Sequence, residues 1–231
     1  MSPIKTLIIS GQNNHDWQRS TPYIWLLLQN SGRFDVDVTT SPDLALAEAS
    51  ALDPFDLIIS DYNGTLWSDK VKVNFEKTIE QGTGLVILHA ADNSFDGWEA
   101  YERMVGLLWR QGTGHGKFHE FPVTITDHQH PITRGLSDFR TTDELYHRLV
   151  HLHHVDYHVL STAFSSEESG GTGGDEPMMV VTQYGEGRVF HQVLGHAWSG
   201  GDLTALENEG FRTSFIRGCE WAATGDVEDN R

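Results

Sequence analysis

Residues 84–93 read GLVILHAADN: a glycine, an apolar run that ends at His89, and then a turn of small and polar residues. The apolar run predicts a buried strand at residues 85–89, as in parallel sheets that are covered on both faces. In such sheets the carboxyl end of a strand points into the ligand crevice, where many α/β enzymes place a nucleophile. The stretch therefore predicts an α/β fold with an imidazole where a hydrolase would carry Cys or Ser.

Strand and helix signals alternate at short spacing around this stretch, which indicates βαβ units and a mostly parallel sheet. Further strands are predicted at residues 4–10, 34–39 and 56–60. Helices are predicted at residues 20–30, 42–51, 68–81 and 95–108. The first half of the chain thus predicts strands that are connected by helical crossovers.

The second half has a different rhythm. After a glycine-rich loop, two strands at residues 157–164 and 178–184 flank a polar loop, 165–177, that we expect to be mobile. The tight GEG at 185–187 predicts a hairpin into RVFHQVL, and residues 209–223 predict an amphipathic helix. The TTDE pattern predicts that TTDELYH, residues 141–147, begins a helix. We expect a single domain over residues 1–225 and an acidic tail at 226–231.

Composition excludes several classes of function. The 231 residues are 38% hydrophobic, which excludes a disordered chain, and the net charge of −17 disfavours nucleic acid and anionic membrane surfaces. No apolar run approaches the roughly 18 residues that cross a bilayer. The start, MSPIKTLIIS, lacks the pattern of a signal peptide, and a single cysteine, Cys219, cannot form an intramolecular disulfide. We therefore expect a cytoplasmic protein.

Three of the thirteen histidines follow predicted strand ends. His15 follows the first strand, His89 ends the fourth and His196 ends the last. If these strands are parallel, the three imidazoles converge at one edge of the sheet, where neighbouring carboxylates would complete a metal or acid–base site. The alternative for each one is an ordinary hydrogen-bonded polar residue.

Several other histidines and the cysteine have simpler explanations. Turn chemistry accounts for His128 and His130, and Cys219 has helix-core neighbours and no adjacent base. We interpret the alternating set as surface or cross-strand residues: His151, His153, His154 and His158.

Five segments together resemble the ThuA-like (trehalose utilisation) family in order and spacing: GQNNHDW, GLVILHAADNSFDGWEAYERMVG, GHGKFHEFPVTITDHQHPITRGL, TTDELYH and YGEGRVFHQVLGHAW. The resemblance implies a flavodoxin-like three-layer α/β sandwich of the class I glutamine amidotransferase-like superfamily. It also implies a role in carbohydrate metabolism, around trehalose and its 3-keto derivatives.

The same superfamily implies a catalytic Cys after the strand that resembles GLVILH, with a late-strand His as its base. His196 resembles that base. The turn after the strand, called the nucleophile elbow, holds His89, Ala90 and Ala91 in place of the Cys. Because covalent amide hydrolysis needs a nucleophile, we do not carry the amidotransferase activity over.

The resulting hypothesis is an enzyme of the isomerase, lyase or hydrolase type that acts on a keto-sugar or glycoside. Its catalytic candidates are His89, His196, Glu144 and His147. The expected substrate contacts are Asp16, Trp17, Asp92, His115, His119, Tyr146 and Trp198, with Trp98 as a further aromatic wall. The candidate metal ligands are His15, His89 and His196.

The expected ligands are a divalent metal such as zinc, with no nucleotide cofactor, and a small carbohydrate, with neither nucleic acid nor membrane as a partner. Apolar residues in VGLLWR and in the last helix offer surface for a homodimer. The alternatives are a non-catalytic sugar-binding or regulatory protein on the same scaffold, and histidines that bind a metal for structure alone.

Overall fold

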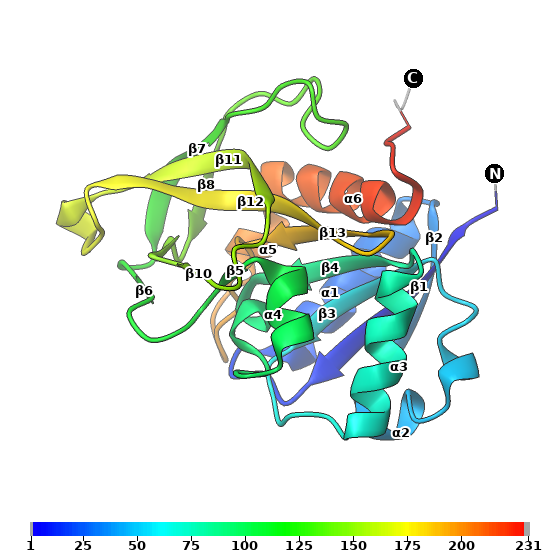
Figure 1. Ribbon diagram of the computed structural model, residues 1–231. Coiled ribbons are helices and arrows are strands. Elements are labelled where there is room, and N and C mark those ends of the chain that lie inside the picture. Colours follow the sequence, from blue (N-terminus) through cyan, green and yellow to red (C-terminus); the bar gives the residue numbers. More distant parts are fainter. Residues whose placement is uncertain (1, 229–231) are drawn as a thin grey trace.

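The computed structural model of the chain describes residues 2–228, so the last residues of the predicted acidic tail lie outside the described part. A nine-stranded sheet forms the centre, in the order β2-β1-β3-β4-β13-β12-β11-β7-β8 (Figure 1). The strands from β2 to β13 are parallel, and those from β13 to β8 are antiparallel. The fold is the predicted α/β sandwich with a mostly parallel central sheet.

The strands of the main sheet are β1 (Ile4–Gly11), β2 (Phe34–Thr39), β3 (Leu57–Tyr62), β4 (Gly84–Leu88), β7 (His119–Ile125), β8 (Phe139–Asp143), β11 (Tyr157–Ser165), β12 (Gly174–Tyr184) and β13 (Gly187–Gln192). Two short pairs join β5 (Leu107–Leu108) to β10 (Val150–His151) and β6 (Gly114–His115) to β9 (Tyr146–His147). The helices are α1 (Trp17–Asn30), α2 (Pro42–Ala45), α3 (Asp69–Glu80), α4 (Glu99–Val105), α5 (Thr204–Glu207) and α6 (Glu209–Thr224), with 3-10 turns η1 (Ala49–Ala51), η2 (His89–Asn93) and η3 (Glu167–Ser169).

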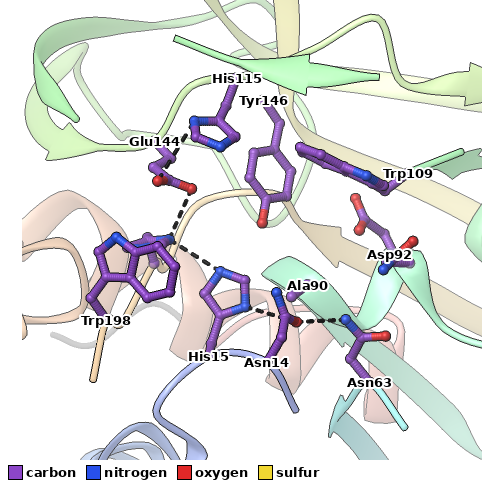
Figure 2. A pocket seen from close by; sticks show the side chains of 12 residues that line it. Asn14, His15, Asn63, Ala90, Asp92, Trp109, His115, Glu144, Tyr146 and Trp198 are labelled. Atoms are coloured by element: carbon purple, nitrogen blue, oxygen red, sulfur yellow. Dashed lines mark hydrogen bonds and ion pairs between the residues drawn. The ribbon is translucent and has the colours of Figure 1, made fainter. Parts of the chain in front are cut away.

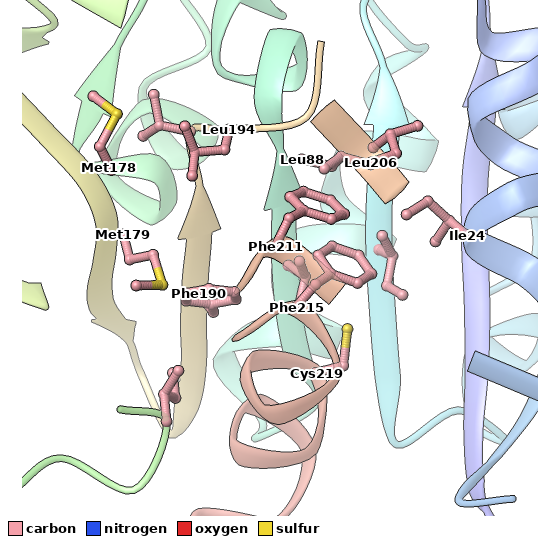
Figure 3. Close-up of a cluster of buried hydrophobic side chains, with 14 of the residues drawn as sticks. Ile24, Leu88, Met178, Met179, Phe190, Leu194, Leu206, Phe211, Phe215 and Cys219 are labelled. Carbon is pink, nitrogen blue, oxygen red and sulfur yellow. The ribbon is translucent and has the colours of Figure 1, made fainter. Parts of the chain in front are cut away.

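Side chains of the parallel strands alternate between two buried layers, as the period of a strand requires. One layer packs against α1 and α6 and includes Phe190, Phe211 and Phe215 (Figure 3). The other packs against α3 and α4. No helix among residues 2–228 is long and apolar enough to span a membrane.

The C-terminal helix lies unusually close to the sheet. A Cβ atom on Gly218 of α6 would sit 2.1 Å from the ring of Phe190, and that atom is absent only because the residue is glycine. Cys219 is buried in the same layer, and burial raises the pKa of its thiol well above the usual value. The cysteine is therefore part of the core.

Several predicted elements differ from the structure. TTDELYH is not helical: it forms the end of β8 and then β9, because residues 139–143 pair with β7. The predicted helix at 42–51 is broken into α2 and η1, and the one at 95–108 is reduced to α4 followed by β5. In TTDELYH the capping pattern was outweighed by pairing with β7, which the sequence of the segment alone does not reveal.

Candidate metal and sugar site

Parallel strands bring three histidines to one edge of the sheet. His15 follows β1, His89 follows β4 and His196 follows β13, and these strands all run in the same direction. His89 has a φ of 44°, a left-handed backbone that costs a non-glycine residue of order 1 kcal/mol or more. The sharp strand-to-helix turn of the nucleophile elbow is therefore present, with an imidazole at its tip.

The fourth member of the site comes from the antiparallel end of the sheet. Strand β8 ends at Asp143, a buried carboxylate that accepts hydrogen bonds from the backbone N–H groups of Glu144 (2.8 Å), Gly195 (2.8 Å) and His196 (3.2 Å). These bonds tie the loop after β13 to the end of β8. Glu144 is thereby held against His196, with 3.1 Å between Oε2 and Nδ1.

His15, His89, Glu144 and His196 form a compact cluster, with one nitrogen or oxygen from each residue all within 4.8 Å of one another. Nδ1 of His196 lies 3.1 Å from Nε2 of His15 and 3.4 Å from Nε2 of His89. Ligands around a tetrahedral zinc ion with bonds of about 2.0–2.1 Å lie about 3.3 Å apart. The contacts of His196 thus have the spacing of metal ligands.

Neighbouring acceptors determine which imidazole nitrogens carry hydrogen. Nδ1 of His89 lies 2.6 Å from the carbonyl oxygen of Val193, so it donates an N–H and leaves a lone pair on Nε2. Nδ1 of His15 faces the side-chain oxygens of Asn13 (3.3 Å) and Asn14 (3.2 Å), so Nε2 again carries the lone pair. Both lone pairs point at the cluster.

Nδ1 of His196 therefore faces two imidazole lone pairs and a carboxylate oxygen. Nε2 of His89 also has the Tyr146 hydroxyl at 2.8 Å, but a single N–H on Nδ1 of His196 cannot be donated to both His15 and Glu144, whereas a cation among the four atoms would satisfy all of them. The donor set of three imidazoles and one carboxylate suits zinc and similar divalent ions. Nε2 of His196 has no hydrogen-bond partner among residues 2–228, unlike the outer nitrogens of His15 and His89.

Burial keeps these imidazoles in the form that binds metals. Desolvation, reinforced by the neighbouring histidines, lowers the pKa of His15 to about 4 and that of His89 well below its usual value. Burial opposes ionisation of Glu144, but the hydrogen bond from His196 and the charges of the nearby histidines outweigh it and lower the pKa of Glu144. Near neutral pH the cluster thus presents neutral imidazoles at His15 and His89 and an ionised carboxylate at Glu144.

A cavity of about 150 Å³ opens beside the cluster. Figure 2 shows the side chains that line it. Its walls combine aromatic rings with carboxylate, amide and imidazole groups: Asn14, His15, Asn63, Ala90, Asp92, Asn93, Trp109, His115, Glu144, Tyr146, His196 and Trp198. The phenol oxygen of Tyr146 lies 2.8 Å from Nε2 of His89, and burial raises its pKa well above 10, so it remains a hydrogen-bond donor. Aromatic faces beside groups that bind hydroxyls suit a sugar ring.

Comparison with known proteins agrees with this architecture. The model of the trehalose utilisation family, ThuA, matches residues 5–222. The chain belongs to the ThuA family. A crystal structure of a ThuA-like protein from Parabacteroides merdae is similar to this one at 35% identity and a TM-score of 0.89, over 100% of this chain and 93% of that one. No curated protein matches.

Two more distant structures share the fold. A ThuA-like protein from Bacteroides uniformis is 20% identical, with a TM-score of 0.75 over 97% of this chain and 94% of that one. A cytoplasmic protein from Salmonella typhimurium is 16% identical, with a TM-score of 0.65 over 95% of this chain and 99% of that one. Both share the fold of this chain over nearly their whole length.

The structure brings many of the predicted site residues together and leaves others outside. The three candidate ligands and Glu144 form the cluster, and Asp92, His115, Tyr146 and Trp198 line the cavity. His115 also lies near the cluster, with 3.6 Å between its Nδ1 and the carboxylate of Glu144.

The remaining predicted residues lie outside the cavity lining. His147 is buried against Ser165, with 3.3 Å between Nδ1 and Oγ, and His119 bonds the carbonyl oxygen of Lys117. Asp16 and Trp17 begin α1. Trp98 packs among Trp67, Phe95 and other rings of the core, so the expectation of an aromatic wall there was wrong.

Sequence reasoning missed several residues of the site. Asn14 and Asn63 lie in the loops after β1 and β3, and a hydrogen bond of 2.7 Å joins them. Single polar residues in loops carry no periodic signal, although their position after parallel strands could have indicated them. Trp109 directly follows the predicted helix 95–108, and it lines the cavity beside Tyr146.

Proposed function

We propose that this member of the ThuA family is a sugar-active enzyme that binds a divalent metal, with zinc the first candidate, and transfers protons on a keto-sugar or glycoside. The observation that carries the proposal is the convergence of four donor atoms below a cavity with aromatic and amide walls. The match to the trehalose utilisation family favours a carbohydrate substrate.

The residues divide into groups by what they can contribute. His15, His89, Glu144 and His196 would hold the metal, which when bound would polarise a sugar oxygen. The phenol of Tyr146 would donate a hydrogen bond to a substrate oxygen. Asn14 and Asn63 would bind hydroxyl groups, as amides do, and the rings of Trp109 and Trp198 would cover apolar faces of the sugar.

The structure also bears on the amidotransferase alternative. The elbow carries His89, followed by Ala90 and Ala91, and the thiol of Cys219 is buried in the core on α6. A covalent acyl intermediate at this elbow would have no thiol or hydroxyl to form on. We therefore infer that the ThuA scaffold here serves a reaction other than glutamine hydrolysis.

Metal analysis and turnover test the proposal. The protein, purified without a histidine tag, should contain close to one equivalent of a divalent metal, and it should convert 3-keto disaccharides in a reaction that chelation abolishes and metal restores. His196→Ala should lose metal and activity, whereas His154→Ala, in the loop before β11, should retain both. A metal-free wild type with unchanged turnover in His196→Ala would overturn it.

A binding function without catalysis predicts a different result. With the metal present, titration of a sugar into the protein would then give heat, and the sugar recovered from the calorimeter cell would be chemically unaltered. That outcome would support the metal and sugar site and reject the hypothesis that the protein is an enzyme.

The exposed ring of Trp198 gives a separate test of the substrate class. This side chain is 56% exposed, yet its ring lies 5.3 Å from that of His196. Trp198→Ala should weaken keto-sugar binding roughly 3- to 10-fold, as expected for a lost stacking contact, with little change in thermal stability. Phe164→Ala on β11, where the ring is 52% exposed outside the cavity lining, is the matched control and should bind as the wild type does.

A further inference from the structure

A second pair of titratable side chains, Asp92 and His191, lies beside the metal-ligand cluster. Asp92 belongs to η2, three residues after His89, and His191 lies on β13, five residues before His196. Oδ2 of Asp92 is 3.5 Å from Nε2 of His191, and the two side chains are 0% and 1% exposed. The pair is therefore buried within the site itself.

Neither side chain of this pair is satisfied. Both carboxylate oxygens of Asp92 and both ring nitrogens of His191 lack a hydrogen-bond partner within residues 2–228. An unsatisfied buried polar group is destabilising, and more so when it is charged, so native structures keep few of them. Four such atoms on two adjacent side chains therefore indicate a missing partner.

The cavity can supply that partner. Asp92 lines it beside Trp109 and Tyr146, and Figure 2 shows these residues on the opposite side of the cavity from Trp198. A molecule in the cavity therefore has the cluster on one side and an unpartnered carboxylate on the other. His191 is absent from the lining, behind Asp92.

We propose that Asp92 is the general base of this site, that it acts on sugars with a carbonyl group next to a C–H bond, and that His191 is its positioning residue. The inference rests on the proposed function and adds the reaction type and the proton acceptor. Proton removal next to a carbonyl needs a base on one side and a stabilised oxygen on the other, and the two sides of this cavity provide them.

The proposed step balances as follows. Asp92 takes the proton from the carbon beside the carbonyl, the C–H electron pair forms a C=C bond, and the carbonyl π pair moves onto oxygen. Return of the proton from Asp92 to the former carbonyl carbon, with transfer of the hydroxyl proton of the neighbouring carbon to the enolate oxygen, moves the carbonyl to that carbon and isomerises the sugar. Alternatively, the enolate oxygen pair restores the carbonyl, the enolate C=C pair forms a new C=C bond to the next carbon, and the oxygen on that carbon leaves with its bonding pair and takes the proton from Asp92, which completes an elimination.

Other groups of the cavity are less suited to this role. The donor atoms of the cluster are occupied when a metal is bound, and the phenol of Tyr146 is held in its protonated form. Burial raises the pKa of Asp92, against the opposing effects of His191 and the Arg110 guanidinium, which makes this carboxylate a stronger base than an exposed one.

His191 can orient Asp92 without touching the substrate. An N–H on Nε2 directed at Oδ2 would fix one carboxylate oxygen and leave the other to face the cavity. The 3.5 Å separation is long for a hydrogen bond, and catalytic hydrogen bonds often shorten only when the substrate binds.

Hydrogen exchange with solvent tests the base. The metal-loaded protein is incubated with a 3-keto disaccharide in D₂O, and deuterium beside the carbonyl and product formation are followed by NMR. Asp92→Asn keeps the shape and one oxygen but cannot accept the proton, so both rates should fall at least about 100-fold. Metal content, and keto-sugar affinity measured by calorimetry, should stay within a few-fold of the wild type.

The matched control is a histidine–aspartate pair away from the cavity. Asp127 lies 2.8 Å from His158 at the surface, and Asp127→Asn makes the same chemical change there. This variant should exchange and turn over as the wild type does.

Two substitutions test the positioning residue. His191→Gln can still present an N–H to Asp92 and should retain activity within about 10-fold, whereas His191→Leu cannot and should fall toward the level of Asp92→Asn. The loss should appear in kcat with little change in KM, since His191 is not in the lining. Equal activity of the Leu variant and the wild type would reject this role.

The outcomes separate the inference from the function on which it rests. If Asp92→Asn exchanges and turns over at the wild-type rate while His196→Ala is inactive, the base is another group and the proposed function stands. If the metal-loaded wild type neither exchanges nor converts keto-sugars, both proposals fail.

Discussion

Asp143 and Asp92 are both fully buried carboxylates of one site, yet their surroundings are opposite. Asp143 accepts three backbone hydrogen bonds, which join the end of β8 to the loop that carries His196. Asp92 accepts none among the described residues and has only His191 at 3.5 Å. The two carboxylates are equally buried, but only that of Asp143 has hydrogen-bond partners. This difference indicates that Asp143 holds the site together and that Asp92 is available to a ligand.

Asp61 extends the comparison to a third buried carboxylate. It accepts hydrogen bonds from Ser20 (3.0 Å), Thr21 (2.7 Å) and Asn13 (3.3 Å). Asn13 in turn accepts a hydrogen bond of 3.0 Å from the backbone N–H of His15. Each end of the cluster therefore has its own satisfied carboxylate as a support, and Asp92 is the exception.

Substitution of Asp143 should have the largest effect on stability. In Asp143→Asn an N–H₂ group replaces one acceptor oxygen and meets a backbone N–H, so at least one buried donor loses its partner. We expect a loss of about 3 kcal/mol of unfolding free energy, since bonds to charged groups contribute about 1.5–3 kcal/mol each. Calorimetry should show a thermal midpoint about 6–12 °C lower.

The control for this substitution lies five residues earlier. Asp138 is exposed and accepts one backbone bond of 2.8 Å, from Ile125, through an oxygen that asparagine retains. Asp138→Asn should change the unfolding free energy by less than about 1 kcal/mol. An equally small change in Asp143→Asn would show that the three bonds of Asp143 do not hold the site.

The pH dependence of stability should report Asp61 with an intermediate effect. Burial raises the pKa of Asp61 to about 6, although its three hydrogen bonds oppose the shift. The folded state therefore binds this proton more tightly than the unfolded chain, and the resulting stabilisation is lost as the pH rises through about 6. Lowering the pH from 7 to 5 should add about 1 kcal/mol to the unfolding free energy through this group.

Urea denaturation of the wild type and Asp61→Asn isolates that contribution, because the other carboxylates titrate in both proteins. The difference between the two unfolding free energies should shift by about 1 kcal/mol in favour of the wild type at pH 5. A difference that is the same at both pH values would mean that Asp61 titrates in its ordinary range.

Much of this arrangement was predictable from the sequence, for a physical reason. Apolar runs such as TLIIS and GLVIL indicate strands of a parallel sheet that is buried on both faces. The carboxyl ends of parallel strands lie at the same edge of the sheet. The convergence of His15, His89 and His196 follows from that rule. Strand β4 was predicted to within one residue at each end.

The supports of the site were not predictable in this way. TTDELYH resembles a helix start, and only pairing with β7 and the bonds of Asp143 to a loop some 50 residues away make it a strand end. His191 interrupts an apolar strand, RVFHQVL, but its sequence does not reveal that Asp92 lies opposite. Hydrogen bonds between buried polar groups that are distant in the sequence form only in the folded chain.

Asp92→Asn should have the smallest effect on stability, and this expectation tests the comparison most directly. It makes the same chemical change as Asp143→Asn at the same burial, but among residues 2–228 the Asp92 carboxylate accepts no hydrogen bond that could be lost. We expect a change in unfolding free energy of less than about 1 kcal/mol in either direction, or less than about 4 °C in the thermal midpoint. A loss as large as that in Asp143→Asn would mean that Asp92 supports the fold, and its assignment as the proton acceptor would lose its structural basis. If Asp92→Asn instead leaves the thermal midpoint unchanged and abolishes proton exchange, the unsatisfied buried carboxylate of Asp92 serves catalysis and does not stabilise the fold.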